Sequence, residues 1–250
     1  MKQPYISSKW KKTAILLKNP ELASYIPESR KFGRRNLHAM LLKHGMVYIK
    51  PVHGMFGRGV MKAEVRTGEN RIFRLYTSRG SRKYISYHTF YNAVKRKAKA
   101  KPYMIQKGIH LLKYRNRPFD IRLMVQKNPQ KVWEATGIIG RLARPGRIVT
   151  NYHSGGTPKD VYVLLSPYLP KEKIKLYIGK LTNIGLQCAA QYERKSRRFN
   201  EIGLDFATDE SFNPWILEVN TRPDPYIFRK LRDKSVFRKV YRYAKAYGRV

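Results

Sequence analysis

A lysine and three closely spaced glycines in the first quarter of the chain have the properties of a phosphate-binding loop. The segment VYIKPVHGMFGRGV (47–60) has a β-branched part that ends at Lys50, and Gly54, Gly57 and Gly59 follow it. Glycine lets backbone N–H groups approach an anion closely, and lysine supplies a point charge for phosphate. The spacing is not that of a P-loop, in which glycine, lysine and serine or threonine open a helix. An ordinary hairpin connection would also explain the loop, so its meaning depends on the groups that accompany it.

Two carboxylates and an amide near the other end of the chain could bind a divalent cation. In EIGLDFATDESFNPWILEVNTRP, Asp205 lies in one predicted strand and Glu218 and Asn220 lie in the next. Side chains two residues apart on a strand share a face, and a hairpin would bring Asp205 beside them. Such oxygen ligands suit Mg²⁺ that is shared with phosphates. Surface carboxylates at strand ends are the alternative, but the chain has only 16 acidic residues and places these two in apolar strands, where an unpaired charge is costly.

A third set of polar residues follows two further predicted strands. In PFDIRLMVQ, Asp120 and Arg122 share a strand face, and GIIGRLARPGRIVTNYHSGG carries Arg141 and then Asn151 before a Gly-Gly pair. Arginines near a phosphate site can hold the transferring group and stabilise its developing charge. Surface salt bridges on a basic sheet would explain any one of these residues. The ordered set favours a site.

The net charge of the chain is extreme, with 53 basic against 16 acidic residues and a formal charge of +37. Basic runs occur at KRKAKAK (95–101) and RKSRR (194–198), and no acidic residue lies between Glu69 and Asp120. A field of this sign attracts polyanions. It fits an acidic macromolecule or nucleic acid as partner, and it fits equally a solvated basic surface.

Other features of the composition narrow the class of protein. The single cysteine, Cys188, excludes an internal disulfide and a metal site built from cysteines. No apolar run approaches the roughly 20 residues that span a bilayer, and the N-terminal residues lack the apolar core of a signal peptide. We therefore expect a cytoplasmic protein with no membrane partner.

The elements that must position these residues alternate between helix and strand. Hydrophobic periodicity and turn residues predict helices over 9–17, 34–45, 85–100, 170–195 and 227–248, and strands over 46–50, 57–67, 71–78, 102–109, 119–127, 132–143, 201–208 and 214–220. Turns are predicted at 67–70, 128–129 and 209–214. Strand pairs mixed with helices favour an α+β enzyme with two lobes around a cleft. We expect residues 1–110 to form the first lobe and 111–250 the second.

The motifs in this chain, and their order along it, resemble those of the ATP-grasp superfamily. The resemblance rests on VYIKP with its glycine loop, YMIQKGI, DIRLMV, RxxxxGRxxTNxxxGG and DFATD…ILEVNTRP, from about Ser8 to Pro225. SKWKKTAILLKNPELASYIPES and EVNTRPDPYIF are similar to the endospore coat-associated YheC/YheD branch. The arginine-asparagine-Gly-Gly stretch also resembles ligases that add glutamate to a ribosomal protein.

The resemblance implies that ATP lies between two α+β lobes. Lys50 would bind the α- and β-phosphates, the glycine loop would cover the β- and γ-phosphates, and a hinge after a strand would contact adenine through backbone groups. Lys9 occupies the family's other nucleotide-lysine position, where Lys11 and Lys12 compete with it. The implied ATP-binding residues are Lys9, Lys50, His53, Gly54, Gly57, Gly59, Gln106, Lys107, Gly108 and Ile109.

The resemblance also implies which residues bind the metal and which contact the phosphoryl group that is transferred. The implied Mg²⁺ ligands are Asp205, Glu218 and Asn220. The implied catalytic residues are Arg122, Arg141 and Asn151, with the arginines facing the γ-phosphate and the acyl phosphate. Two features depart from the family: few residues precede the nucleotide lobe, so we expect no full N-terminal domain, and Asp224 replaces the usual glycine in NTRPDP.

The family's reaction is ATP-dependent ligation of a carboxylate to an amine through an acyl phosphate. We expect an acidic amino acid, peptide or protein tail as substrate, ahead of nucleic acid as partner, and spore association besides a cytoplasmic location. The alternative function is a non-catalytic, coat-associated protein that binds polyanions or nucleic acid. The aromatic residues form no recognisable motif for stacking single strands, which weighs against nucleic acid.

Overall fold

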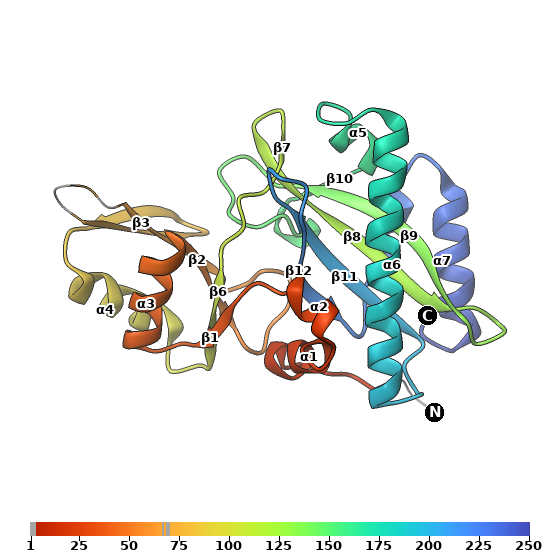
Figure 1. Ribbon diagram of the computed structural model, residues 1–250, viewed down its shortest axis with the longest axis horizontal. Coiled ribbons are helices and arrows are strands. Elements are labelled where there is room, and N and C mark those ends of the chain that lie inside the picture. The colour runs from red at the N-terminus through yellow and green to blue at the C-terminus, as the bar shows by residue number, and fades with distance from the viewer. Residues whose placement is uncertain (1–3, 67, 69–70) are drawn as a thin grey trace.

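The computed structural model describes residues 4–66, 68 and 71–250, and it contains two β-sheets flanked by helices (Figure 1). The first sheet has the strand order β1-β6-β2-β3-β4-β5, with neighbouring strands antiparallel. Its strands are β1 (Ser29–Lys31), β2 (Met46–Pro51), β3 (Met61–Arg66), β4 (Ile72–Thr77), β5 (Gly80–Tyr84) and β6 (Tyr103–Lys107). Helices α3 (Arg34–His44) and α4 (Tyr87–Ala98) bury Leu37, Met40 and Phe90 in the core of this sheet.

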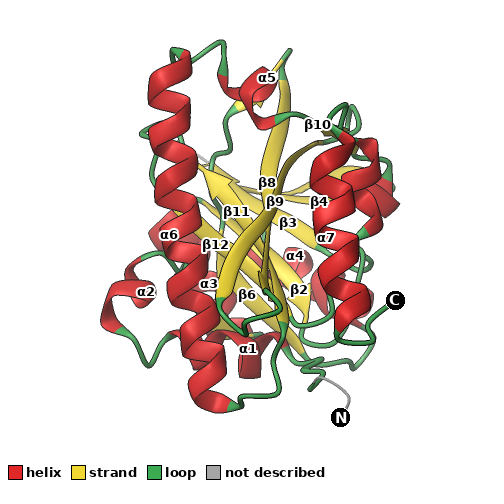
Figure 2. Ribbon diagram, turned by 90° about the vertical axis from the view of Figure 1, so that its right-hand side faces the viewer, coloured by secondary structure: helices red, strands yellow, loops and turns green. Residues whose placement is uncertain are grey.

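The second sheet has the order β10-β9-β8-β11-β12, and β7 pairs with β8 beside it. Its strands are β7 (Lys113–Tyr114), β8 (Arg117–Lys127), β9 (Trp133–Leu142), β10 (Thr157–Lys159), β11 (Glu201–Thr208) and β12 (Pro214–Asn220). Helices α6 (Lys171–Lys195) and α7 (Lys234–Ala246) lie on opposite sides of β8 and β9 (Figure 2). Leu123 and Val125 pack in the α6 core, whereas Met124 packs in the α7 core, as the two-residue period of a strand requires.

The first two helices of the chain pack with the second sheet. Figure 1 shows α1 (Lys9–Leu16) and α2 (Pro20–Ser24) beside α6, and Ile15 and Leu22 belong to the same buried core as that helix. The side chains of Gln191 and Tyr192 on α6 donate hydrogen bonds to carbonyls of α1. This packing fixes α1, and therefore Lys9, against the second sheet. A division of the chain into lobes at residue 110 stays a prediction.

Most of the predicted elements are present. The pairs β8–β9 and β11–β12 are antiparallel, as predicted from the turns between them. Strands β3 and β4 also pair, although the turn predicted at 67–70 lies, apart from Gly68, outside the described residues. Among the described residues, no helix is long and apolar enough to cross a bilayer.

The prediction of one continuous helix over 227–248 is wrong. The segment is a short 3-10 helix, η2 (Tyr226–Lys230), followed by an extended stretch and then α7. The carboxylate of Asp233 accepts a hydrogen bond from the backbone N–H of Ser235 at 2.8 Å, which caps the start of α7. Strands β1, β5, β7 and β10 and the short helices α2, α5 (Val161–Leu165) and η1 (Tyr152–Ser154) were not predicted.

Candidate functional site

A cavity of about 800 Å³ lies between the two sheets. This is in the upper part of the range of roughly 300–1,000 Å³ that is typical of small-molecule sites. Its wall includes thirteen of the sixteen residues that the sequence assigned to ATP, Mg²⁺ or catalysis: Lys9, Lys50, Gly54, Gly57, Gln106, Lys107, Ile109, Arg122, Arg141, Asn151, Asp205, Glu218 and Asn220. Segments far apart in the chain therefore converge on one space, as the motif order predicted.

Three of the residues predicted to bind ATP lie outside this wall. The exposed His53 ring is 3.1 Å from the Ser7 hydroxyl. The Gly59 carbonyl accepts a hydrogen bond from the Tyr103 hydroxyl at 3.2 Å. Gly108 packs so closely that a Cβ there would be 2.6 Å from a Met46 side-chain carbon. These three residues therefore contact other parts of the protein and do not line the cavity.

The glycine loop folds toward the second sheet. Gly54, Gly57 and Gly59 all have positive φ, between +71° and +153°, a region that favours glycine. A Cβ on Gly57 would lie 2.9 Å from the Asn151 side-chain oxygen, and the Ser154 hydroxyl donates to the Phe56 carbonyl at 2.8 Å. The loop thus borders the cavity and contacts the segment that carries Asn151.

Lys50 lies at the end of β2 and has a neutral partner. Its ammonium group donates a hydrogen bond to the Gln106 side-chain oxygen at 2.5 Å. Burial lowers the pKa of Lys50 to about 8, an effect that the nearby Glu218 opposes. Because Gln106 carries no charge, the positive charge of Lys50 is available to an anionic ligand.

Lys9 is the member of the first-helix lysines that lines the cavity. Its ammonium group donates to the Gly54 carbonyl at 3.0 Å and lies 3.6 Å from Glu218. Burial lowers the pKa of Lys9, although the Glu218 carboxylate acts in the opposite direction. Lys12, one turn later, is buried and pairs with Glu218 at 2.7 Å, whereas Lys11 is exposed. The contacts favour Lys9 for the nucleotide.

The two predicted metal-binding carboxylates are adjacent and already have basic neighbours. Asp205 and Glu218 face each other in the β11–β12 register. Asp205 lies 2.5 Å from Arg122 and 3.0 Å from Arg141. Burial alone would raise the pKa of Asp205, but the two guanidinium groups outweigh it and hold the pKa below its ordinary value. Burial would likewise raise the pKa of Glu218, but Lys12 and Lys9 together outweigh it and lower that pKa. Basic side chains thus offset the negative charge of the two carboxylates that were predicted to bind a metal.

The remaining oxygen atoms still fit a magnesium ion. Asp205 and Glu218 each use one oxygen, Oδ1 and Oε1, for these basic partners. Within the described part of the chain, Asp205 Oδ2, Glu218 Oε2 and the Asn220 amide make no hydrogen bond. Two carboxylate oxygens and an amide oxygen are hard ligands of the kind that Mg²⁺ prefers.

Asp120 is a buried residue of the site to which the sequence gave no role. It faces Arg141 in the β8–β9 register and accepts hydrogen bonds from two nitrogens of that guanidinium, at 2.8 and 2.5 Å. The Thr150 hydroxyl donates to the same carboxylate at 2.6 Å. Together, Asp120 and Asp205 hold the pKa of Arg141 above its ordinary value against the effect of burial. The signal in the sequence was the acid on the same strand face as Arg122.

Several known proteins are similar to this chain in sequence or in fold. The endospore coat-associated protein YheD of Bacillus subtilis (strain 168) is 27% identical over 225 residues, which is 88% of this chain and 49% of that protein. The chain thus spans about half the length of this curated relative. The crystal structure of the D-cycloserine synthetase DcsG has a TM-score of 0.57 at 12% identity, covering 96% of this chain and 70% of that one. An ADP complex of purK, an N5-carboxyaminoimidazole ribonucleotide synthetase, has a TM-score of 0.53 at 11% identity and covers 96% and 51%.

These structural likenesses, together with the match to an ATP-grasp family model, show the α+β ATP-grasp fold predicted from the sequence. The motifs that led to that prediction carry the lysines, carboxylates and arginines that line one cavity in the structure. The model of the YheC/D-like ATP-grasp family matches residues 1–250, and the chain belongs to this family.

Proposed function

We propose that the protein is an ATP-dependent carboxylate–amine ligase, the class of enzyme for which the ATP-grasp fold is typical. One observation carries the proposal: positive, carboxylate and amide side chains from both sheets converge on a single cavity. Lys50 offers a positive charge on the side of the first sheet. Arg122 and Arg141 line the same cavity from the second sheet.

The reaction requires no covalent bond to the protein. A carboxylate oxygen of the substrate attacks the γ-phosphorus of ATP, the bond to the β,γ-bridging oxygen breaks, and ADP leaves with the bonding electrons. The nitrogen of a neutral amine then attacks the acyl carbon, the carbon–oxygen bond to phosphate breaks, and the nitrogen loses a proton to give the amide. The protein must therefore orient the reactants and offset their charge.

The chain offers groups for these tasks. Lys50 and Lys9 would bind phosphate oxygens. Arg122 uses only Nε in its contact with Asp205, and Arg141 uses Nε and Nη2. The other guanidinium nitrogens make no hydrogen bond within the described residues, so they can donate to the transferring phosphoryl group.

The same carboxylate pair would hold the metal. Asp205, Glu218 and Asn220 would bind Mg²⁺, which offsets phosphate charge when it is bound.

The substrate that we favour is an acidic amino acid, peptide or protein tail. The net charge of +37 supports a negatively charged partner because such a field accelerates encounters with anions. The YheD relative is named as endospore coat-associated, and we extend the proposal to an association with the spore.

The test is to follow release of ADP and inorganic phosphate from Mg²⁺-ATP while acidic amino acids or peptides are paired with amines. The proposal expects ADP release that depends on both substrates, with an amide product of the corresponding mass. ATP binding without turnover for any acidic substrate would contradict it.

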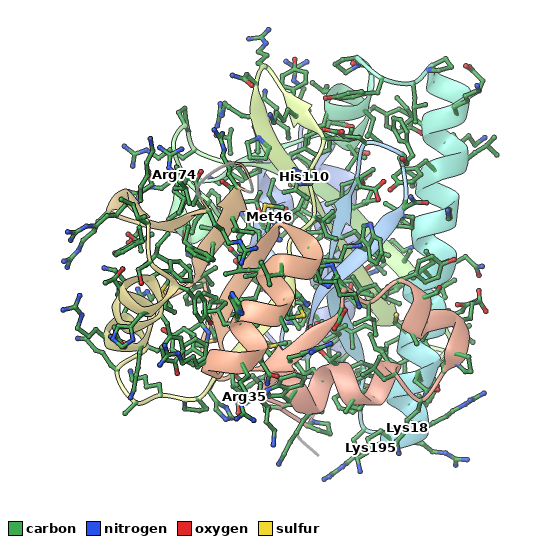
Figure 3. All side chains as sticks on the ribbon, turned by 60° about the vertical axis from the view of Figure 1, so that its left-hand side comes forward. Lys18, Arg35, Met46, Arg74, His110 and Lys195 are labelled. Carbon is green, nitrogen blue, oxygen red and sulfur yellow. The ribbon has the colours of Figure 1, made fainter. Side chains whose placement is uncertain are left out.

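A second candidate is a non-catalytic protein that binds polyanions. Basic side chains such as those of Lys18, Arg35 and Lys195 are exposed at the surface (Figure 3). Association with acidic polymers that persists without nucleotide, in a protein that does not bind ATP, would favour this candidate.

A further inference from the structure

One end of the cavity is lined by exposed apolar and aromatic side chains. They are Tyr5 (52% exposed), Met55 (58%), Phe56 (38%), Tyr152 (37%) and Tyr226 (46%). We call this region the aromatic end. Large apolar side chains gathered at the mouth of a cavity mark a surface that a ligand covers.

The aromatic end is continuous across the two sheets. The Phe56 ring, on the glycine loop, lies 4.2 Å from the His153 ring. His153 in turn lies 3.8 Å from the carboxylate of Asp224, and the backbone N–H of Tyr226 donates to that carboxylate at 2.9 Å. The glycine loop, η1 and the residues after β12 therefore surround one opening.

Two arginines at this opening have no acidic partner among the described residues. Arg58 follows Phe56 on the glycine loop, and Arg222 follows β12; both line the cavity and both are exposed. Neither side chain forms a hydrogen bond or ion pair with a described residue. By contrast, Arg249, which also lines the cavity, is 2.9 Å from Glu201. The positive charges of Arg58 and Arg222 are thus available to a ligand.

The carboxylate of Asp224 at this end does not cancel them. Asp224 is hydrogen-bonded to the backbone of Tyr226 and faces His153. The local balance therefore stays positive. A guanidinium group binds a carboxylate in bidentate fashion, and tyrosine and phenylalanine rings offer flat surfaces for packing against a chain.

We propose that the aromatic end binds an acidic peptide segment, with carboxylates on Arg58 and Arg222 and the peptide chain packed against the rings. The proposal rests on the proposed function, because the reacting carboxylate would have to extend from this end toward Arg122 and Arg141. It adds a substrate class, a peptide with more than one carboxylate, and two residues that recognise it. The general charge of the surface would bring the peptide near, and these arginines would select its position.

The experiment measures binding of a fluorescent glutamate peptide, and of a glutamine peptide of the same length, in the presence of Mg²⁺ and a non-hydrolysable ATP analogue. Each of Arg58→Gln and Arg222→Gln should weaken binding of the glutamate peptide about tenfold, which is the loss of one charged hydrogen-bonded contact. The glutamine peptide should bind weakly to every form. Binding of the ATP analogue is measured on the same samples. Arg222→Gln, which lies outside the glycine loop, should change it much less than it changes binding of the glutamate peptide.

Arg35→Gln is the matched control, since it removes the same charge from α3 at the exposed surface (Figure 3). Equal weakening by this variant would show a general field and would overturn the proposal. Tighter binding of a DNA oligonucleotide through Arg58 and Arg222 would also overturn it. If the wild type binds the glutamate peptide through these arginines but does not bind the ATP analogue, the proposed ligase function fails while the peptide site stands. If it binds the analogue and not the peptide, the peptide site fails alone.

Discussion

The cavity has one wall from the first sheet and one from the second, and the two walls differ in the partners of their basic side chains. In the first wall the partner is a neutral group, and in the second wall the partners are carboxylates. Lys50 is hydrogen-bonded to the Gln106 amide. Arg141 lies between Asp120 and Asp205. Both walls are basic by residue type, but Lys50 in the first wall has a neutral partner, whereas Arg122 and Arg141 in the second wall are paired with carboxylates. We infer that the first wall attracts phosphate and that the second holds its arginines in fixed positions.

This difference changes what a substitution does. A buried ion pair that loses one partner leaves an uncompensated charge, which is strongly destabilising. A lysine with a neutral partner leaves no such charge behind. Substitutions in the second wall should therefore act mainly on stability, and substitutions in the first wall mainly on ligand affinity.

The largest effect is expected for Asp120→Ala. It removes the partner of two Arg141 nitrogens and of the Thr150 hydroxyl inside the protein. We expect the free energy of unfolding to fall by about 3 kcal/mol, the lower part of the range for broken buried pairs, because Asp205 still contacts Arg141. Denaturation by urea would measure it.

Thr150→Val is the matched control for this variant. It removes a single hydrogen bond to Asp120 and leaves the ion pair, so the loss should be about 1 kcal/mol. Equal losses for the two variants would show that the ion pair does not hold this wall together.

The next effect is expected for Lys50→Met, and it should appear in affinity. Loss of a charged phosphate contact should weaken ATP binding by about 1.5–3 kcal/mol, a factor of ten or more. The free energy of unfolding should change by less than about 1 kcal/mol, since no buried charge is left without a partner. Calorimetric titration and urea denaturation of the same variant test both statements. A large loss of stability with unchanged affinity would reverse the roles of the two walls.

The sequence predicted the helices and strands, and the convergence of the site residues, better than it predicted which side chains pair with one another. Asp205 and Glu218 were brought together correctly because strand periodicity and a short turn are local properties. The sequence could not show that α1 packs on α6, because that contact joins residues far apart in the chain. For the same reason it missed Lys12 as the partner of Glu218. The break in the last helix depended on Asp233 as a cap, which was available as a signal but was outweighed by helical periodicity on both sides.

A third prediction concerns Lys12. It tests whether Mg²⁺ can replace the lysine side chain as the positive partner of Glu218 in the second wall. Lys12→Met removes the closest positive partner of the Glu218 carboxylate. Without Mg²⁺, we expect the free energy of unfolding to fall by about 1–3 kcal/mol. Addition of Mg²⁺ should raise the melting temperature of the variant more than that of the wild type, because a cation bound only to the folded state stabilises it.

Lys11→Met is the control, since Lys11 is exposed on the same helix. It should lose little stability and should respond to Mg²⁺ like the wild type. If Mg²⁺ stabilises all three proteins equally, the metal does not bind at Glu218.

The smallest effect is expected from pH and acts through Lys50 in the first wall. Burial lowers the pKa of Lys50 from an ordinary 10.5 to about 8, with Glu218 opposing and Lys9 adding to the shift. If only the protonated lysine attracts phosphate, raising the pH from 7 to 9 should weaken ATP binding by up to about tenfold. Lys50→Arg, which keeps its charge over this range, should lose much less. Stability has the opposite trend: the folded state holds fewer protons on Lys50 than the unfolded state between about 8 and 10.5, so this group alone makes the free energy of unfolding rise with pH there. ATP affinity that is independent of pH in the wild type, or that falls equally in Lys50→Arg, would show that the charge of the first wall resides elsewhere.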